Sequence, residues 1–300
     1  MEYFLELSSS GLVRGSIYAL IALGYTMVYG IIQLINFAHG EIYMIGAFVA
    51  LIVSGVLTIY GFSGVSILIL AALIAAIYAA AYGYTLEKIA YRPLRKAPRL
   101  SPLISAIGMS LFLQNYVLLA QTPDFLRFPA LIPDFEFMEP IAHIMGSAEL
   151  VILVTSAVSM VALTVLIKYT RIGKAMRATQ QDMIMARLVG VNVDNVISMT
   201  FIIGSVLAAI GGVLVGSYIG QINFYIGFMA GVKAFTAAVL GGIGNIPGAV
   251  LGALVLGLTE AYAAGYISSA YEDVFAFGVL VLILILRPSG LLGKAVKQKV

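Results

Sequence analysis

Long apolar stretches recur along the whole chain and alternate with short polar segments. Most of them approach the roughly 20 residues that a helix needs to cross a bilayer core of about 30 Å. The pattern therefore predicts an all-α polytopic integral membrane protein with about eight or nine transmembrane segments. The stretches fall at about 10–31, 42–60, 64–86, 102–121, 149–168, 195–219, 229–244, 247–266 and 274–287.

Two of these stretches, 229–244 and 274–287, are short for a full crossing at about 1.5 Å per residue. We expect broken or re-entrant helices there, because irregular backbone at membrane depth is tolerated only where it borders protein or a cavity. Pairing 229–244 with 247–266 as a re-entrant hairpin gives the chain an odd number of crossings.

A polar interruption, Ile35-Asn36-Phe37-Ala38-His39-Gly40-Glu41, separates the first two apolar stretches and has a counterpart in the second half of the chain. A shift of 187 positions places Ile222-Asn223-Phe224 on its first three residues and Gly227 on Gly40. Residues 20–50 and 207–237 then share 12 identities in 31 ungapped positions. We infer an internal repeat, with halves at about 10–120 and 195–287 inside a single domain of residues 1–300.

The two halves should run in opposite directions, because four apolar stretches separate 10–31 from 195–219. Inverted repeats with broken helices at matching places put a substrate path near the membrane middle. We therefore predict that the breaks at Asn36 and Asn223 approach each other there, related by a pseudo-two-fold axis in the membrane plane.

Composition excludes a soluble domain, since 61% of the residues are hydrophobic and only 10% are charged, against about 25% charged in soluble chains. The N-terminus lacks the basic region and cleavage motif of a signal peptide, so we expect the first stretch to stay as a membrane span. The absence of cysteine excludes a disulfide, a thiolate metal site and a cysteine nucleophile.

Basic residues gather in three segments, which are 87–99, 168–194 and the tail from 287. Together these hold 14 of the 17 lysines and arginines, whereas 122–148 carries four acidic residues against one arginine. Because cytoplasmic loops carry an excess of Lys and Arg, we predict that the three basic segments are cytoplasmic and that the N-terminus and 122–148 lie outside.

The two interruptions supply the first candidate residues for a substrate path. They either line or gate the path or cap helix ends at an interface. A metal site is not expected, because the chain has only two histidines, His39 and His143, and no H-E-x-x-H pair. The candidates are Asn36, Phe37, His39, Glu41, Asn223 and Phe224.

Two charged residues, Lys233 and Glu260, lie inside apolar stretches. Intramembrane charges usually face the bundle interior or water and have a partner. Three interpretations stay open: a structural ion pair, a direct contact with a zwitterionic solute, and snorkelling of the side chains to an interface.

The segment 169–194 contains apolar residues at helical spacing with charges between them, which predicts a short amphipathic helix ending at Gly190. It either lies on the membrane surface or docks a cytoplasmic partner, with Met176, Met183 and Ala186 as contact area. The candidate docking residues are Arg177, Gln181, Asp182, Met183, Ala186, Arg187 and Gly190.

Three runs resemble the permease subunits of bacterial branched-chain amino-acid ABC transporters, specifically the H-type (LivH) subunits. These runs are 15–30 continuing into 36–41, then 223–244, and 287–293. The stretch 177–190 is similar to the family's ATPase-docking loop. It differs at Gln181, where the family often has an acidic residue before Asp182.

The resemblance implies a multi-pass protein of a bacterial or archaeal inner membrane that translocates leucine, isoleucine and valine. It also implies a second homologous permease chain, two cytoplasmic ATP-binding subunits and an extracytoplasmic solute-binding protein, with no nucleic acid involved. The chain has no G-x-x-x-x-G-K-[ST] phosphate loop, so we expect no cofactor in it and ATP on the partner subunits.

Alternative functions stay open at this point. Related permeases handle urea, amides or aromatic acids, and an ion-coupled secondary transporter would use the same inverted repeat. An enzyme is not expected, because no Ser-His or paired-Asp arrangement stands at convincing spacing.

Overall fold

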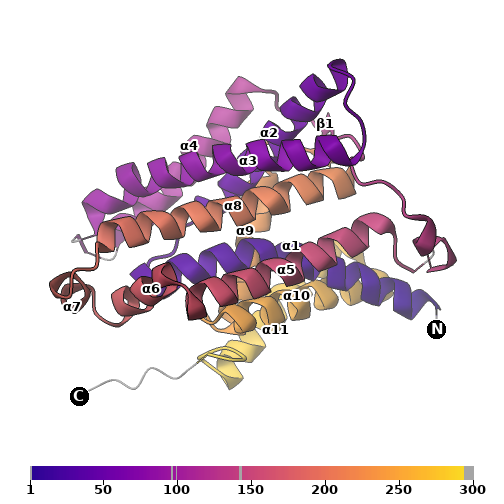
Figure 1. Cartoon of the computed structure of the whole chain (residues 1–300). Helices are drawn as coiled ribbons and strands as arrows, with labels where there is room; N and C mark the ends of the chain where they lie inside the picture. The colour runs from indigo at the N-terminus through magenta and orange to yellow at the C-terminus, as the bar shows by residue number, and fades with distance from the viewer. Residues whose placement is uncertain (1, 96, 99, 142–143, 294–300) are drawn as a thin grey trace.

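A computed structural model describes residues 2–95, 97–98, 100–141 and 144–293 of the chain. His143, Lys96, Arg99 and the tail lysines therefore lie outside the described residues. Figure 1 shows an elongated helical bundle with one two-stranded ribbon. Its elements are α1 (Glu2–Ile32), α2 (His39–Ile59), α3 (Val65–Leu86), the π-turn η1 (Glu87–Tyr91), η2 (Arg92–Leu94), α4 (Leu100–Ala120), β1 (Leu126–Arg127), η3 (Glu136–Ile141), α5 (Ser147–Tyr169), α6 (Arg171–Gln181), α7 (Met183–Leu188), α8 (Val193–Ile219), β2 (Gln221–Ile222), α9 (Ile226–Gly241), α10 (Ile246–Tyr266), η4 (Ser269–Tyr271) and α11 (Glu272–Leu286).

The predicted apolar stretches are confirmed as helices. Eight helical segments of the described chain are long and apolar enough to cross a membrane, and α9 is a shorter apolar helix of 16 residues. Two boundaries differ from the expectation. Helix α1 begins at Glu2 rather than near 10, and the segment 87–94, expected as a loop, continues α3 as a π-turn followed by a 3₁₀ turn.

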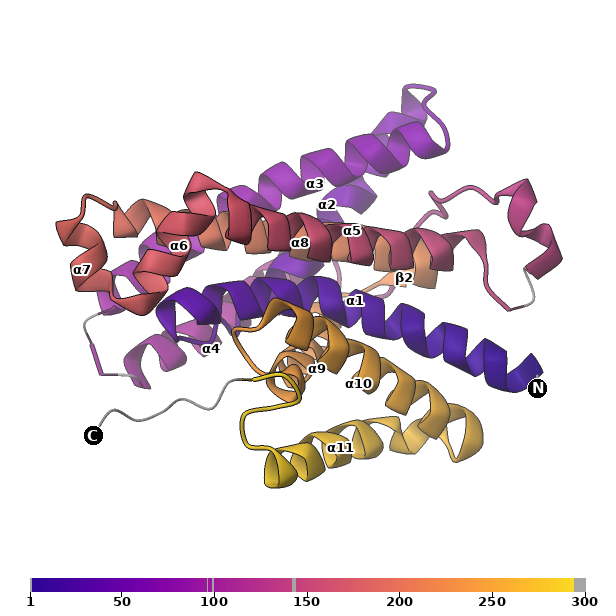
Figure 2. The same ribbon diagram turned by 60° about the horizontal axis from the view of Figure 1, so that its bottom comes forward.

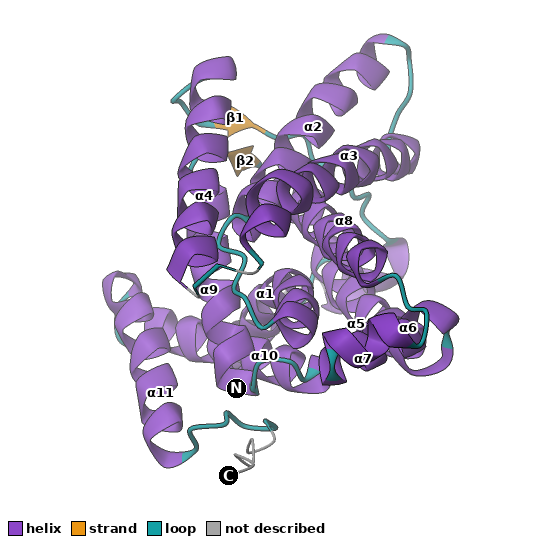
Figure 3. Cartoon of the chain, turned by 90° about the vertical axis from the view of Figure 1, so that its left-hand side faces the viewer, coloured by secondary structure: helices purple, strands orange, loops and turns teal. Residues whose placement is uncertain are grey.

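Helices α1 and α8 form the centre of the molecule. In the most apolar window of each, 83% and 72% of the residues are buried, compared with 28% or less in α3, α4, α5 and α11. The outer helices therefore present apolar surface to lipid or to partners. In the view along the bundle, α1 lies among α5, α8, α9 and α10 (Figure 3).

The two halves pack as an inverted repeat. A Cβ atom at Gly211 would lie 3.5 Å from Leu20, and one at Gly204 would lie 3.3 Å from Gly24, so α1 and α8 are antiparallel. Helix α10 packs on α1 in the way that its counterpart α3 packs on α8 (Figure 2). The equivalent pairs α2–α8 and α9–α1 complete the pattern.

Glycine allows these close approaches. A Cβ atom at Gly15 would lie 2.7 Å from the backbone of Leu254, and one at Gly257 would lie 2.3 Å from the backbone of Gly15. Lipid is as apolar as a leucine side chain, so helices in a membrane associate through such tight contacts rather than by burying apolar surface from water.

The bundle has two ends of different charge. The N-terminal end gathers the start of α1, the β1–β2 ribbon, the start of α5 and the end of α10. The opposite end, called here the α6–α7 end, gathers η1, η2, α6, α7 and the residues after α11. The described parts of the three basic segments therefore share one end, as the charge pattern predicts, and their cytoplasmic location stays a prediction.

Candidate functional site

The first break turns the chain back toward the bundle centre. It starts at Gln33, whose φ of 53° is unusual for a residue with a side chain. Helix α2 then begins at His39, which is wedged between Gly24 of α1 and Gly204 of α8. A Cβ atom at Gly24 would lie 2.2 Å from the His39 ring. A larger residue at position 24 would therefore displace the start of α2.

The second break, residues 220–225, leads into α9 in the same way, and the first turns of α2 and α9, which follow the two breaks, are in contact. A Cβ atom at Gly40 would lie 2.3 Å from the carbonyl oxygen of Gly227. A Cβ atom at Gly227 would lie 2.7 Å from the carbonyl oxygen of Gly40. These two glycines are equivalent in the repeat, so a contact between them lies on the pseudo-two-fold axis. The phenyl rings of Phe37 and Phe235 pack beside it, with centroids 5.7 Å apart.

The asparagines themselves lie away from this contact. Asn36 is buried and accepts a 2.9 Å hydrogen bond from the Tyr91 hydroxyl. Asn223 accepts one from the backbone N–H of Tyr225, and the neighbouring Phe224 is half-buried. The contact is therefore made by glycines in the first turns of α2 and α9 and not by the asparagines, and an approach of the breaks near the membrane middle stays a prediction.

His39 and Glu41 are buried in the packed layer around the axis. Ser110 of α4 donates a 2.9 Å hydrogen bond to Glu41 Oε1. Glu41 Oε2 and His39 Nε2 have no hydrogen-bond partner among the described residues. The Tyr25 ring packs edge-on against His39 with a 4.9 Å centroid distance. Unpaired buried polar atoms are uncommon and call for an explanation.

Lys233 and Glu260 form an ion pair, the first of the three interpretations that the sequence left open. Their Nζ–Oε1 distance is 3.1 Å, and Lys233 also lies 2.8 Å from Asp273 at the start of α11. Tyr18 of α1 donates a 2.7 Å hydrogen bond to the other oxygen of Glu260, which is fully buried. The network joins α1, α9, α10 and α11.

A cavity of about 510 Å³ opens beside this network. It has charged groups of both signs, Arg14, Lys233 and Glu272, with Arg14 and Glu272 paired at 3.0 Å. Asn223 also lines it, and most of the other lining residues are apolar or aromatic. Lys233 therefore takes part in an ion pair and also faces a space that a solute could fill. The apolar lining includes Ile17, Tyr43, Val215, Ile226 and Met229.

A second cavity of about 540 Å³ lies toward the α6–α7 end. Four residues of α1 line it, and residues of α6 form part of its wall. The lining includes Thr26, Met27, Gly30 and Ile31 of α1 with Met176, Arg177 and Gln180 of α6. Along α1 it is separated from the first cavity by the buried residues 20–25, which include the neighbours of His39. A packed layer therefore stands between two cavities.

The predicted docking helix is two helices, which corrects the expectation of one. Helix α6 ends at Gln181 and α7 starts at Met183. Between them Asp182 is extended and caps α7, accepting hydrogen bonds from the backbone N–H of Ile184 and Met185. Gly190 has a φ of 87° and follows the end of α7. Arg177 donates to the last carbonyls of α5, so it holds α6 against this chain.

The predicted contact area on this segment is wrong for two residues. Met176 and Ala186 are buried within the chain, and Met183 is half-buried against its core. Helical spacing shows that such residues share a face but does not show what covers that face. The exposed apolar side chains are Ile184, Met185, Leu188 and Val189. Gln181 and Arg187 are also exposed.

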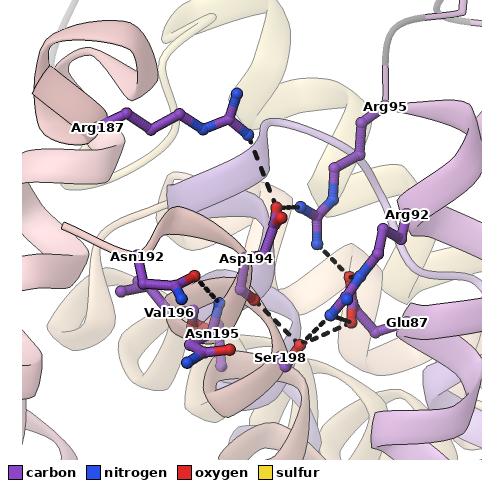
Figure 4. Close-up of polar contacts among 10 residues, drawn as sticks. Glu87, Arg92, Arg95, Arg187, Asn192, Asp194, Asn195, Val196 and Ser198 are labelled. Atoms are coloured by element: carbon purple, nitrogen blue, oxygen red, sulfur yellow. Dashed lines mark hydrogen bonds and ion pairs between the residues drawn. The ribbon is translucent and has the colours of Figure 1, made fainter. Parts of the chain in front are cut away.

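Figure 4 shows a polar cluster at this end that the sequence did not identify as a site. Glu87 is fully buried and paired with Arg92 and Arg95, while Asp194 of α8 is paired with Arg95 and Arg187. The spacing of Glu87 and Arg92, five residues apart, was the one feature of the sequence that indicated part of this cluster. The partner on α8 lies about a hundred residues away in the chain.

An inverted repeat of apolar helices, with two breaks in contact and a cavity on either side of them, defines a membrane transport protein. A family model described as "Branched-chain amino acid transport system / permease component" matches residues 7–284. The chain belongs to this family. It is therefore a transport permease, a multi-pass protein of the inner membrane.

Three relatives illustrate the match. Over 302 residues, 99% of this chain and 98% of the relative, the chain is 49% identical to the high-affinity branched-chain amino acid transport system permease protein LivH of Escherichia coli K12. With the same coverage it is 50% identical to BraD of Pseudomonas aeruginosa, which has the same description. The autoinducer 2 import system permease protein LsrC of Yersinia enterocolitica is 33% identical over 146 residues, 47% of this chain and 40% of that protein.

Proposed function

We propose that this chain is one permease subunit of an ABC importer for branched-chain amino acids. It works with a second homologous permease, two cytoplasmic ATPases and an extracytoplasmic binding protein, and ATP is hydrolysed on the ATPases. The observation that carries the proposal is the near-full-length identity of 49–50% with two permeases described for that transport.

The cavity at the N-terminal end supports a zwitterionic solute with an aliphatic side chain. Arg14 offers a guanidinium to a carboxylate, and Glu272 offers a carboxylate to an ammonium group. Ile17 and Met229 supply apolar surface in the same cavity. Urea or an amide carries no charge and could not form an ion pair with either group.

The packed layer is the closed gate of the path. A solute moving from the first cavity to the second must pass residues 20–25 and the glycine contact between the breaks. When the layer separates, Glu41 Oε2 and His39 Nε2 gain access to water or solute as hydrogen-bond partners. This explains why they have no partner within the described chain in the closed state.

The exposed apolar side chains of α7 form the docking surface for an ATPase, with Arg187 and Gln181 at its edge. Helix α6 walls the second cavity through Met176, Arg177 and Gln180. A shift of the docked segment therefore changes the shape of that cavity. Coupling requires that ATP binding favour one arrangement over the other.

Uptake by the reconstituted complex tests the proposal. Leucine, isoleucine and valine should compete with one another for ATP-dependent uptake, and a hundred-fold excess of urea or acetamide should leave leucine uptake unchanged. A complex that accumulates the amide, and that ignores isoleucine and valine, would refute the proposed substrate.

A further inference from the structure

The buried carboxylate Glu87 stands at the junction of α3 and the basic segment. Arg92 Nη2 lies 3.0 Å from Glu87 Oε2, Arg95 pairs with Oε1, and Ser198 of α8 donates a 2.7 Å hydrogen bond to Oε2 (Figure 4). A buried carboxylate is costly unless its oxygens are paired, and here both are. Glu87 therefore fixes the turn η1–η2 rigidly to the start of α8.

The same cluster reaches the docking segment. Arg95 pairs with Asp194 in the first turn of α8 at 2.5 Å, and Arg187 of α7 lies 3.6 Å from the same Asp194 oxygen (Figure 4). The Arg187–Asp194 pair is about half exposed on both sides, so it contributes little stability of its own. It is the part of the cluster that a docked partner can most easily rearrange.

The other side of η1 touches the first break. Tyr91 is fully buried, its ring packs against Phe201 of α8 at a 5.1 Å centroid distance, and its hydroxyl donates to Asn36 Oδ1 at 2.9 Å. The turn that carries Tyr91 is a π-turn, a form often found at functional sites. Asn36 belongs to an irregular segment that begins at the strained Gln33.

We propose that Glu87, Tyr91 and Arg95 are positioning residues that relay the position of the docking segment to the first break. The inference rests on the proposed function. The turn η1–η2 and α8 move as one body because Glu87 and Ser198, which join them, are both buried. The first break changes conformation because its backbone has no regular hydrogen bonding. Tyr91 transmits the movement of η1 to this break through its hydrogen bond to Asn36. None of the three residues touches the cavity at the N-terminal end.

The test compares Tyr91→Phe, which removes the hydroxyl and keeps the ring, with Tyr84→Phe, a control on an exposed tyrosine of α3, the helix that η1 continues. The full complex is reconstituted, and leucine uptake is measured per ATP hydrolysed. Tyr91→Phe should lower this ratio about five-fold or more, the lower range of measured coupling between sites. ATPase binding should persist, and Tyr84→Phe should behave as the unsubstituted chain.

Two further measurements make the relay specific. Asn36→Ala should also lower the ratio, and the double variant should lower it no further than Tyr91→Phe alone, because Tyr91→Phe already removes the hydroxyl's bonds to Asn36 and to the Ile35 carbonyl. A single cysteine at Leu34→Cys, in this cysteine-free chain, should change its labelling rate on ATP addition with Tyr91 present and not in the Tyr91→Phe background.

The outcomes separate the two proposals. Any one of three results refutes the relay: a normal ratio in Tyr91→Phe, additive effects of the two substitutions, or an ATP response of the Leu34→Cys label that persists without the hydroxyl. In each case ATP-dependent uptake by the complex would still support the permease function. If the unsubstituted complex shows no ATP-dependent uptake, both the proposed function and the relay are refuted.

Discussion

Replacing Gly40 by alanine tests the contact between the two breaks. The new Cβ atom would lie 2.3 Å from the carbonyl oxygen of Gly227, whereas ordinary contacts begin at 3.4 Å. The start of α2 must therefore move away from α9 by about 1 Å, and the obstacle is backbone, which cannot rotate aside. Overpacking of this kind costs about 1–3 kcal/mol, and we expect the upper part of that range.

The matched control is Gly55→Ala, in the same helix, where nothing lies within 4 Å of the added atom. Alanine gains up to about 1 kcal/mol over glycine inside a helix, so this variant should be neutral or slightly stabilised. Thermal unfolding in detergent should show a midpoint several degrees lower for Gly40→Ala and unchanged or higher for Gly55→Ala. Leucine uptake should fall only in the former.

The equivalent substitution Gly227→Ala adds its Cβ atom 2.7 Å from the Gly40 carbonyl oxygen, on the other side of the same contact. One outward movement of α2 from α9 makes room for both added Cβ atoms. The double variant should therefore lose less stability than the sum of the losses of the two single variants. If Gly40→Ala unfolds at the temperature of Gly55→Ala and transports normally, the breaks do not meet at these glycines and the assignment of the axis is wrong.

Three other predictions follow from the same structure. Lys233→Met leaves Glu260 buried without its cation and should lower the free energy of unfolding by about 3–5 kcal/mol, measured as a lower yield and melting temperature. Adding Glu260→Leu should recover part of this loss. Equal stability of the single and double variants would argue against the ion pair. The double variant Ile184→Ser with Leu188→Ser, on the exposed face of α7, should insert normally but should no longer co-purify with the ATPases. The control Ile104→Ser, exposed on an outer helix, should still co-purify with them. ATPase binding by the double variant would place the docking surface elsewhere. Single cysteines at Glu6 and Asp124, which are exposed, should react with an impermeant reagent from outside intact cells. Cysteines at Lys96 and Lys297, which lie outside the described residues, should not, and outside labelling of Lys96→Cys would contradict the predicted orientation.

The membrane helices and the repeat were predictable because their signals are local or direct. Apolar runs of bilayer length mark spans, and the identities around Asn36 and Asn223 mark equivalent breaks. The contact between Gly40 and Gly227 follows the same equivalence, since an inverted repeat brings matching residues to its axis. The sequence analysis predicted a contact at the asparagines instead, because polar residues in an apolar stretch are a stronger signal than glycines.

Long-range partners were not predictable. Arg14 pairs with Glu272 across 258 positions, and Glu87 meets Ser198 across 111. No spacing rule connects such residues. The division of the docking segment at Asp182 had a signal, because an aspartate before a helical run is a good N-cap. The burial of Met176 and Ala186 had none, since a helical face packs equally well on its own chain or on a partner.

The central claim is that ATP hydrolysed on partner subunits drives solute through this chain. The most direct measurement is leucine uptake into proteoliposomes holding the full complex, with ATP enclosed on the ATPase side and the proton and sodium gradients abolished by ionophores. The account predicts that uptake continues at its normal rate and stops when ATP is replaced by a non-hydrolysable analogue. Uptake that needs an ion gradient and ignores ATP would contradict it and identify a secondary transporter.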